Sequence, residues 1–294
     1  MTDTALIIGA SGRFGRHATE ALAARGWTIR RFDRARDDLA EAARGAALIV
    51  FAANPPYPDW ARVMPALTDR VITAARGAGA TILFPGNVYV FGRGAPATLG
   101  VETPHRATNP LGRIRIEVER KLRDSGVPVI LLRAGDFIDT APSGNWFDRV
   151  LTAKLARGRL SYPGRADAPH AWAFLPDLAR AAAMLASRRA TLARVEEVPF
   201  PGYTLSGAEL AEALGRVTGR KVTLRRMSWW PLRLARPVWP MAAPLLEMRY
   251  LWDMPHALDG ARLAALLPDF AATPLDEALS AALKHQIDPD QAVA

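Results

Sequence analysis

The most informative stretch of this 294-residue chain reads Ala5-Leu6-Ile7-Ile8-Gly9-Ala10-Ser11-Gly12-Arg13-Phe14-Gly15. Its apolar residues predict a buried strand, and three glycines spaced three apart lead from that strand into a helix. Gly9 permits a tight turn, Gly12 lets the backbone approach a ligand, and Gly15 lets the helix pack against the strand. The N–H groups at the start of a helix attract anions, so the loop is predicted to bind a pyrophosphate.

A second predicted strand, residues 28–32, ends at Asp33, roughly twenty residues after the glycine loop. A carboxylate there can accept hydrogen bonds from the ribose hydroxyls of an adenosine. The loop also lacks the Lys-Ser/Thr ending of nucleotide triphosphatases, so we expect a dinucleotide, NAD or NADP. Asp33 favours NAD because it repels the 2′-phosphate of NADP, whereas Arg34 and Arg13 can bind that phosphate. The choice between the two cofactors stays open.

Apolar runs alternate with helical patterns through the first half of the chain, which predicts βαβ units. We expect strands over residues 5–9, 28–32, 47–53, 80–85 and 127–134. We expect helices over residues 15–25, 37–44, 60–78 and 113–125. The predicted fold class is α/β, with a Rossmann, doubly wound and mostly parallel sheet.

The pattern becomes less regular after Asp136. We expect short elements there: a helix over 146–157, a strand over 160–162, an extended segment over 172–175 and a helix over 177–187. Further on come extended residues 195–200, a helix over 206–218 capped by Ser206, a strand over 222–227 and a stretch rich in Trp and Pro, 228–254. We therefore predict an NAD(P)-binding core over 1–185, to which parts of later segments return, and a small α+β substrate cap over 186–294 that does not fold independently.

The composition argues against several classes of ligand and of catalytic site. The net charge is +9, but 34 of the 38 basic residues are Arg and they are spread along the chain, which argues against nucleic acid as a partner and leaves a small anionic ligand attractive. The chain has no cysteine, which excludes disulfides, thiol catalysis and Cys-ligated zinc. Its five histidines are scattered, so we expect no metal site.

The chain shows no long apolar run and no signal-peptide pattern, so we expect no integral membrane segment and a cytoplasmic location. A homodimer remains an open possibility. Four tryptophans of the late stretch mark either core packing or a surface for a membrane or partner protein: Trp229, Trp230, Trp239 and Trp252.

Several motifs resemble the extended short-chain dehydrogenases/reductases and nucleotide-sugar epimerases: Gly9-x-x-Gly12-x-x-Gly15, the strand end 49–53, Glu102-x-Pro104, Arg133-Ala134-Gly135 and the segment 170–178. The resemblance runs over most of the chain. It implies an NAD(P) cofactor, places Arg133-Ala134-Gly135 beside the nicotinamide, and gives Glu119 the position of the glutamate in the family's Tyr-x-x-x-Lys-x-x-x-Glu helix. The family usually places two helices and an edge strand where this chain has only residues 34–46, so we expect a more open adenine pocket.

The residues that transfer protons in that family are replaced. Asn87 stands in the place of its serine, Leu111 in that of its tyrosine and Arg115 in that of its lysine. Arg115 can still supply a positive charge and a contact to the nicotinamide ribose. Tyr89, two residues beyond Asn87, is either a displaced acid or a pocket wall. As an acid, its pKa should be lowered by Arg115 and the nicotinamide.

The sequence therefore predicts Tyr89, Asn87 and Arg115 as catalytic residues. The predicted cofactor-binding residues are Gly9, Ser11, Gly12, Arg13, Phe14, Gly15, Asp33, Arg34, Ala52, Ala53 and Arg115. Two functions fit these residues. One is an NAD(P)-dependent oxidoreductase or epimerase-like enzyme with a non-standard active site and a small organic, nucleotide-sugar-like substrate. The other is a non-catalytic NAD(P)-binding sensor or scaffold.

Overall fold

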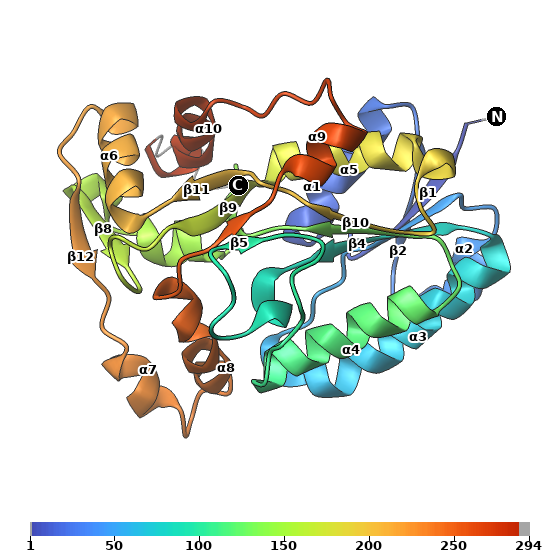
Figure 1. Ribbon diagram of the computed structural model, residues 1–294, viewed down its shortest axis with the longest axis horizontal. Helices are drawn as coiled ribbons and strands as arrows, with labels where there is room; N and C mark the ends of the chain where they lie inside the picture. Colours follow the sequence, from blue (N-terminus) through green and yellow to red (C-terminus); the bar gives the residue numbers. More distant parts are fainter. Residues whose placement is uncertain (1, 288–294) are drawn as a thin grey trace.

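A six-stranded parallel sheet forms the centre of the computed structural model, which describes residues 2–287 (Figure 1). Its spatial order is β10-β6-β4-β3-β1-β2, and every neighbouring pair is parallel. The strands are β1 (Thr4–Ile8), β2 (Thr28–Phe32), β3 (Leu48–Phe51), β4 (Thr81–Gly86), β6 (Val129–Arg133) and β10 (Val195–Pro199). The predicted strands of the first half are therefore all present, with ends shifted by at most a few residues.

Helices cover both faces of this sheet (Figure 1). On one face lie α1 (Arg13–Ala24), α5 (Leu175–Ser187) and α9 (Ala261–Leu266); on the other lie α2 (Leu39–Ala43), α3 (Trp60–Ala78) and α4 (Pro110–Asp124). Alternation along β1 explains the two layers: Leu6 and Ile8 pack into the α3–α4 core, whereas Ala5 and Ile7 pack into the α1–α5 core. The predicted doubly wound Rossmann fold is confirmed.

The order of the strands reverses at β1, which lies between β2 and β3. Loops that follow such a switch point diverge to opposite faces of the sheet and leave a crevice, where ligands of α/β proteins bind. The glycine loop is the segment that follows β1. Between β2 and β3 the chain forms only α2, as predicted, and β2 is therefore an edge strand of the sheet.

Smaller sheets extend the fold beyond the carboxyl ends of the central strands (Figure 1). Their pairs join distant parts of the chain: β5 (Thr98–Leu99) with β13 (Ala257–Leu258), β7 (Asp136–Ile138) with β9 (His170–Phe174) and β11 (Tyr203–Leu205), and β8 (Arg159–Tyr162) with β12 (Thr223–Arg226). Helices α6 (Gly207–Thr218) and α10 (Leu275–Ile287) pack together beside them. Core and cap are thus interleaved in sequence, because β8 comes before residue 186 and β10 after it.

The predicted regular helix over 146–157 is wrong. The chain forms one π-helical turn, Phe147–Leu151, and one 3₁₀ turn, Leu155–Arg157. The backbone N–H and the hydroxyl of Thr152 both donate to the carbonyl of Phe147, at 2.9 and 2.8 Å, which fixes a five-residue spacing that an α-helix does not have. The predicted cap at Ser206 is confirmed, since its hydroxyl accepts from the N–H of Glu209 at 3.2 Å.

The stretch over 228–254 forms two short helices and a 3₁₀ segment: α7 (Trp230–Ala235), α8 (Ala242–Glu247) and η6 (Met248–Trp252). Of the four tryptophans in this stretch, two pack in the core and two lie on the surface. Trp229 and Trp252 are buried in the cap core, whereas Trp230 and Trp239 are exposed. Within residues 2–287, no helix combines the length and the apolar character that a bilayer crossing requires.

Candidate functional site

The glycine loop has the tight geometry that its sequence predicts. Gly9 has φ +89°, in the left-handed region, and its carbonyl accepts a hydrogen bond from the N–H of Gly12 at 3.0 Å. A Cβ on Gly9 would lie 2.7 Å from the backbone nitrogen of Ala53, and one on Gly15 would overlap the carbonyl of Gly9. The loop therefore closes only with glycine at these two positions.

Gly12 is the position that leaves room for a ligand. It begins α1 without a side-chain cap, and a Cβ on it would meet only the carbonyl oxygens of Gly9, at 3.1 Å, and Ala52, at 4.0 Å. The first N–H groups of the helix thus lie beside a stretch of backbone with no side chain in the way. This cradle fits a pyrophosphate, because a Cβ at Gly12 would occupy part of the space that the anion needs.

The neighbouring predicted cofactor residues play different parts. Ser11 is exposed at the loop, and the side chain of Phe14 is buried in the core, so only its backbone can face a phosphate. Arg13 donates from its guanidinium to the carbonyls of Ser143, at 3.0 Å, and Gly144, at 2.8 Å. Its side chain ties the start of α1 to this later loop, and a role in binding a cofactor phosphate stays a prediction.

Asp33 lies directly after β2, at the same edge of the sheet as the glycine loop. Its carboxylate accepts from the N–H of Ala35 at 2.9 Å and lies 3.6 Å from the guanidinium of Arg36. The next residue, Arg34, is exposed in the same turn. Asp33 and Arg34 are therefore adjacent and open to solvent, as their predicted part in cofactor choice requires.

Asn87 follows β4 and begins the 3₁₀ turn η2 (Val88–Phe91). Its side-chain oxygen accepts from the N–H of Tyr89 at 3.1 Å, and its carbonyl accepts from Arg133. Both groups therefore help to build the turn. This local role explains the Asn at a position where the resembling family has a catalytic Ser, since Asn caps turns well.

Tyr89 pairs with a tyrosine that the sequence did not single out. Its hydroxyl lies 2.7 Å from the hydroxyl of Tyr57, in the turn η1 (Tyr57–Asp59) after β3, and Trp60 packs against both rings. Burial and the neighbouring Tyr57 raise the pKa of Tyr89 well above 10, and burial also raises the pKa of Tyr57. The chain's own residues therefore raise this pKa and do not lower it as expected, because desolvation outweighs the attraction of Arg115.

Arg115 lies on α4, beneath the tyrosine pair, and is 4% exposed. Its guanidinium packs over the rings of Phe84 and Trp60, at 4.5 and 5.6 Å, and donates to the carbonyl of Pro85 at 2.7 Å. Burial lowers the pKa of Arg115 to about 10, so it is still charged near neutrality. Its side chain thus supports the end of β4, and its predicted contact to a ribose stays a prediction.

A second group missed by the sequence reasoning lies after β6. Asp136 directly follows the predicted Arg133-Ala134-Gly135 turn, and its carboxylate accepts a hydrogen bond from Nε2 of His170 at 2.7 Å. His170 in turn stacks on Trp252 with ring centres 4.4 Å apart and an angle of 7°. The charge of Asp136 contributes to the raised pKa values of Tyr57 and Tyr89, so the carboxylate faces the same region as the pair.

Only the turn that precedes Asp136 was visible in the sequence. Its partner His170 stands 34 residues later, and His256, whose ring centre lies 4.5 Å from that of His170, is still further along. Periodicity could not have brought these side chains together. The parallel pairing of β9 with β7 brings His170 to Asp136, and the N–H of His256 donates to the carbonyl of Pro169 at 2.9 Å, which places His256 beside His170. Within residues 2–287 no three metal-ligating side chains gather at one place.

Arg133 connects the ends of β4 and β6, which precede Tyr89 and Asp136, to α4. It is fully buried, and its guanidinium donates to Glu119 at 2.8 Å, to Glu197 at 2.6 Å and to the carbonyl of Asn87. Burial, which raises the pKa of Glu119, is outweighed by Arg133, so that pKa lies below its usual range. The network fixes the ends of β4 and β6 relative to α4, and so fixes the backbone from which Tyr89 and Asp136 project.

Comparison with known proteins finds similar folds among solved structures. No protein-family model and no curated protein matches the sequence. Among solved structures, MoeE5 in complex with UDP-glucose and NAD is 18% identical, with a TM-score of 0.77 over 97% of this chain and 99% of MoeE5. UDP-glucose 4-epimerase from Brucella ovis in complex with NAD is 20% identical, with a TM-score of 0.75 over 97% of this chain and 98% of its own.

A nucleoside-diphosphate-sugar epimerase from Pseudomonas aeruginosa is similar over 99% of both chains, with 19% identity and a TM-score of 0.74. These identities are low, and the likeness rests on the arrangement of the elements along the whole chain. The chain therefore shares the overall fold of these three proteins.

Proposed function

We propose that this protein is an NAD(P)-dependent enzyme of the epimerase or oxidoreductase type, with its reaction centre at the carboxyl edge between β3, β4 and β6. One observation carries the proposal. A glycine cradle at the switch point of the sheet stands on the same edge as a tyrosine pair and a carboxylate. Cofactor binding and proton transfer need these two kinds of site side by side.

The cofactor has support from both the loop and the fold. Gly9, Gly12 and Gly15 form a cradle that a pyrophosphate fits, and Asp33 stands where an adenosine ribose would be recognised. MoeE5 and the Brucella epimerase, which share the fold, are both seen with NAD. The nicotinamide, when bound, would accept a hydride from the substrate or return one to it.

The chain's own residues would handle the proton. Tyr89 keeps its proton at neutral pH because its pKa is raised, so it can donate a hydrogen bond to a substrate oxygen and would pass on the proton only when that oxygen becomes the stronger base. Tyr57 orients that hydroxyl through the 2.7 Å contact. Asp136, held by His170, is the hydrogen-bond acceptor that faces the same region.

We propose a nucleotide-sugar-like substrate as the finer form of this function. The support is that MoeE5, with the same fold, is seen with UDP-glucose and with UDP-glucuronic acid. A cap built from β7–β9–β11 and β8–β12 covers the carboxyl edge, which is where a substrate of this fold would lie.

One observation favours a second candidate, a dinucleotide sensor or scaffold that does not catalyse. Arg115 is turned onto the carbonyl of Pro85, and Leu111 is 3% exposed and packed in the core, so the two positions that carry proton transfer in the resembling family serve packing here. Such a protein would bind NAD(P) and respond to a partner without turnover.

Calorimetry combined with single-turnover spectroscopy separates these functions. Binding of NAD⁺, NADH, NADP⁺ and NADPH is measured first, and reduction or oxidation of the bound nicotinamide is then followed at 340 nm, about the usual wavelength for NADH, while nucleotide sugars and simple carbonyl compounds are added. Binding with turnover supports the enzyme, and binding without turnover supports the sensor. If no dinucleotide binds, both proposals are wrong.

A further inference from the structure

A basic and apolar hairpin projects from the cap. We define the α7–α8 hairpin as residues 229–247, which Figure 1 shows at the far end of the cap from the glycine loop. Within residues 2–287, four of the five exposed large hydrophobic side chains belong to it: Trp230 at 64%, Leu234 at 71%, Val238 at 83% and Trp239 at 42%. The structure thus concentrates nearly all of its large exposed apolar side chains within ten consecutive residues, 230–239.

This exposure does not come from poor packing of the hairpin. Trp229 is 5% exposed, donates from its indole N–H to the carbonyl of Pro163 at 2.7 Å and packs against Trp146. The next residue, Trp230, points into solvent. The hairpin is therefore anchored to the cap on one side and presents an apolar surface to solvent on the other. Exposed apolar surfaces of this kind commonly mark a binding site for a membrane or a protein partner.

Positive charge predominates on the hairpin and on the chain that leads into it, although Glu247 at its end is acidic and Arg216 is paired with Asp276. Residues 213–246 contain no Asp or Glu and seven basic residues: Arg216, Arg220, Lys221, Arg225, Arg226, Arg233 and Arg236. Arg233 and Arg236 interleave with the exposed apolar residues, and no carboxylate in residues 2–287 lies within ion-pair distance of either. The surface is therefore complementary to a dense layer of negative charge.

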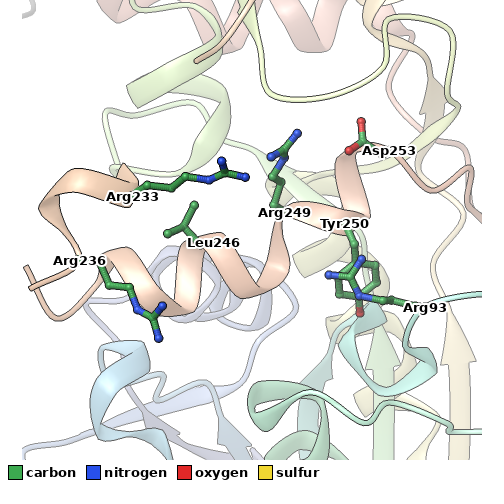
Figure 2. A pocket seen from close by; sticks show the side chains of 7 residues that line it. All are labelled: Arg93, Arg233, Arg236, Leu246, Arg249, Tyr250 and Asp253. Atoms are coloured by element: carbon green, nitrogen blue, oxygen red, sulfur yellow. The ribbon is translucent and has the colours of Figure 1, made fainter. Parts of the chain in front are cut away.

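A cavity of about 590 Å³ lies at the base of the hairpin (Figure 2). Arg93, Arg233, Arg236 and Arg249 line it, and Asp253 is the acidic residue of its wall. Figure 2 shows three of these arginines around Leu246 and Arg93 against Tyr250. The hydroxyl of Tyr250, a residue that is 6% exposed, has no hydrogen-bond partner within the described chain. Guanidinium groups and a phenol are donors that bind phosphate oxygens.

A second copy of this chain is a poor occupant of the surface. A two-fold dimer would bring two such hairpins together, and the one acidic residue of each, Glu247, already accepts hydrogen bonds from Asn109 and from the N–H of Leu111, which leaves the arginines of one hairpin facing those of the other. An anionic bilayer can bind both the arginines and the exposed apolar side chains of the hairpin. Its phosphates pair with arginine, and tryptophan with aliphatic side chains settles in the layer between headgroups and acyl chains.

We propose that the α7–α8 hairpin docks this protein on an anionic phospholipid surface, with Trp230, Leu234 and Val238 inserted between lipids and headgroup phosphates received by the arginine cavity. The docking is peripheral and reversible, since the inserted side chains are few and the hairpin stays anchored through Trp229. It is independent of the reaction at the sheet edge, so a failure of the proposed enzyme function leaves this proposal standing.

Vesicle co-sedimentation of the full chain tests the proposal. The probes are vesicles of phosphatidylcholine alone and vesicles with roughly one-third phosphatidylglycerol. One variant removes the charge, Arg233→Gln with Arg236→Gln, and one removes the apolar surface, Trp230→Ala with Leu234→Ser and Val238→Ser. The matched control is Arg31→Gln with Arg70→Gln, which removes the same charge from exposed positions on β2 and α3. Unchanged melting temperatures show that all variants fold.

The proposal expects the protein to sediment with the anionic vesicles alone and to be released by about 0.5 M salt. Both hairpin variants should lose about tenfold or more in partitioning, and the control should keep most of its binding. Equal loss in the control would assign the binding to overall charge and overturn the proposal. Absence of vesicle binding would also overturn it, as would self-association in vesicle-free buffer that the apolar variant abolishes.

Discussion

The hydroxyl oxygens of Tyr57 and Tyr89 lie 2.7 Å apart, although the two residues come from loops after different strands. Trp60 packs against both rings, and the charge of Asp136 acts on both phenols. In the proposed function, this pair would take the part of the Tyr of the resembling family, with a phenol on another element that is held by a second tyrosine and not by a lysine.

Tyr89→Phe should slow turnover without weakening cofactor binding. General acid catalysis typically contributes about 10²–10⁴-fold, so we expect a loss of at least tenfold in kcat with unchanged dinucleotide affinity. Tyr57→Phe should lose less, since it orients the hydroxyl and leaves it in place. Steady-state kinetics and calorimetry measure the two effects. A smaller loss in Tyr89→Phe than in Tyr57→Phe would transfer the assignment to Tyr57.

The proton held by Tyr89 also predicts a pH profile. Because its pKa is raised well above 10, the phenol stays protonated between about pH 6 and 9. A reaction that uses Tyr89 as a donor should therefore show no loss of rate through this range from that group. A fall in kcat with a midpoint near pH 7 that disappears in Tyr89→Phe would show that the cofactor lowers this pKa after all.

Gly12→Val should abolish dinucleotide binding while the chain still folds. A Cβ at this position meets only two carbonyl oxygens, at 3.1 and 4.0 Å, so the substitution fills the cradle and needs the carbonyl of Gly9 to move by a few tenths of an ångström. Gly77→Ala on α3 is the matched control, because nothing lies within 4 Å of its added Cβ. Calorimetry should show loss of binding in the first variant only. Equal affinity in both would place the cofactor elsewhere.

Asp33→Ala should shift cofactor preference from NAD toward NADP. The carboxylate repels a 2′-phosphate and accepts hydrogen bonds from ribose hydroxyls, and such charged hydrogen bonds contribute about 1.5–3 kcal/mol. Arg34→Ala should act in the opposite direction if its exposed guanidinium meets that phosphate. The ratio of the NAD and NADP affinities is the measurement. A ratio unchanged in both variants would remove these residues from the cofactor site.

Glu119→Gln should lower the free energy of unfolding by about 3–5 kcal/mol, because it leaves Arg133 with one carboxylate in a dry site. The pKa of Glu119 is depressed in the folded state, so its ionised form stabilises the fold above its ordinary pKa of about 4.3 and this contribution is lost as the pH falls below that value. In urea titrations, the difference in the free energy of unfolding between wild type and variant should therefore become smaller toward pH 4 and below.

Asp124→Asn is the control for that experiment, since it removes a carboxylate from an exposed pair with Arg120 at 3.1 Å. Exposed pairs contribute less than about 1 kcal/mol, so its unfolding curve should stay close to that of the wild type at every pH. A comparable loss in the two variants would mean that the buried network does not hold the strand ends as inferred.

His256→Phe should make the fold less sensitive to mild acid. Burial and the neighbouring His170 lower the pKa of His256 to about 3, whereas an unfolded histidine titrates near about 6.5. The unfolded state therefore takes up the proton first, and stability is lost as the pH falls from about 6.5 toward 3. Thermal unfolding at pH 7 and pH 5 should show a smaller drop for His256→Phe than for wild type.

The sequence by itself determined the class of fold and the place of the cradle. The glycine spacing after β1, the acid after β2 and the βαβ rhythm are local signals, and each reports on residues a few positions apart. For that reason the strands, the single helix between Asp33 and Ala47 and the cap at Ser206 were predicted correctly. The wrong helix over 146–157 is a local failure, where the side chain of Thr152 competed with the helical spacing.

Only the tertiary structure decided what surrounds the proposed reaction centre. Three contacts join residues that are distant in sequence: Tyr57 with Tyr89, His170 with Asp136 and Glu197 with Arg133. The pairing of strands within the central sheet and within the β7–β9–β11 sheet brings them together. The same burial reversed the expected pKa of Tyr89, since desolvation depends on neighbours that no spacing reveals. Local chemistry sets which residues can bind a dinucleotide, and the long-range packing of the sheet and cap sets which side chains meet it.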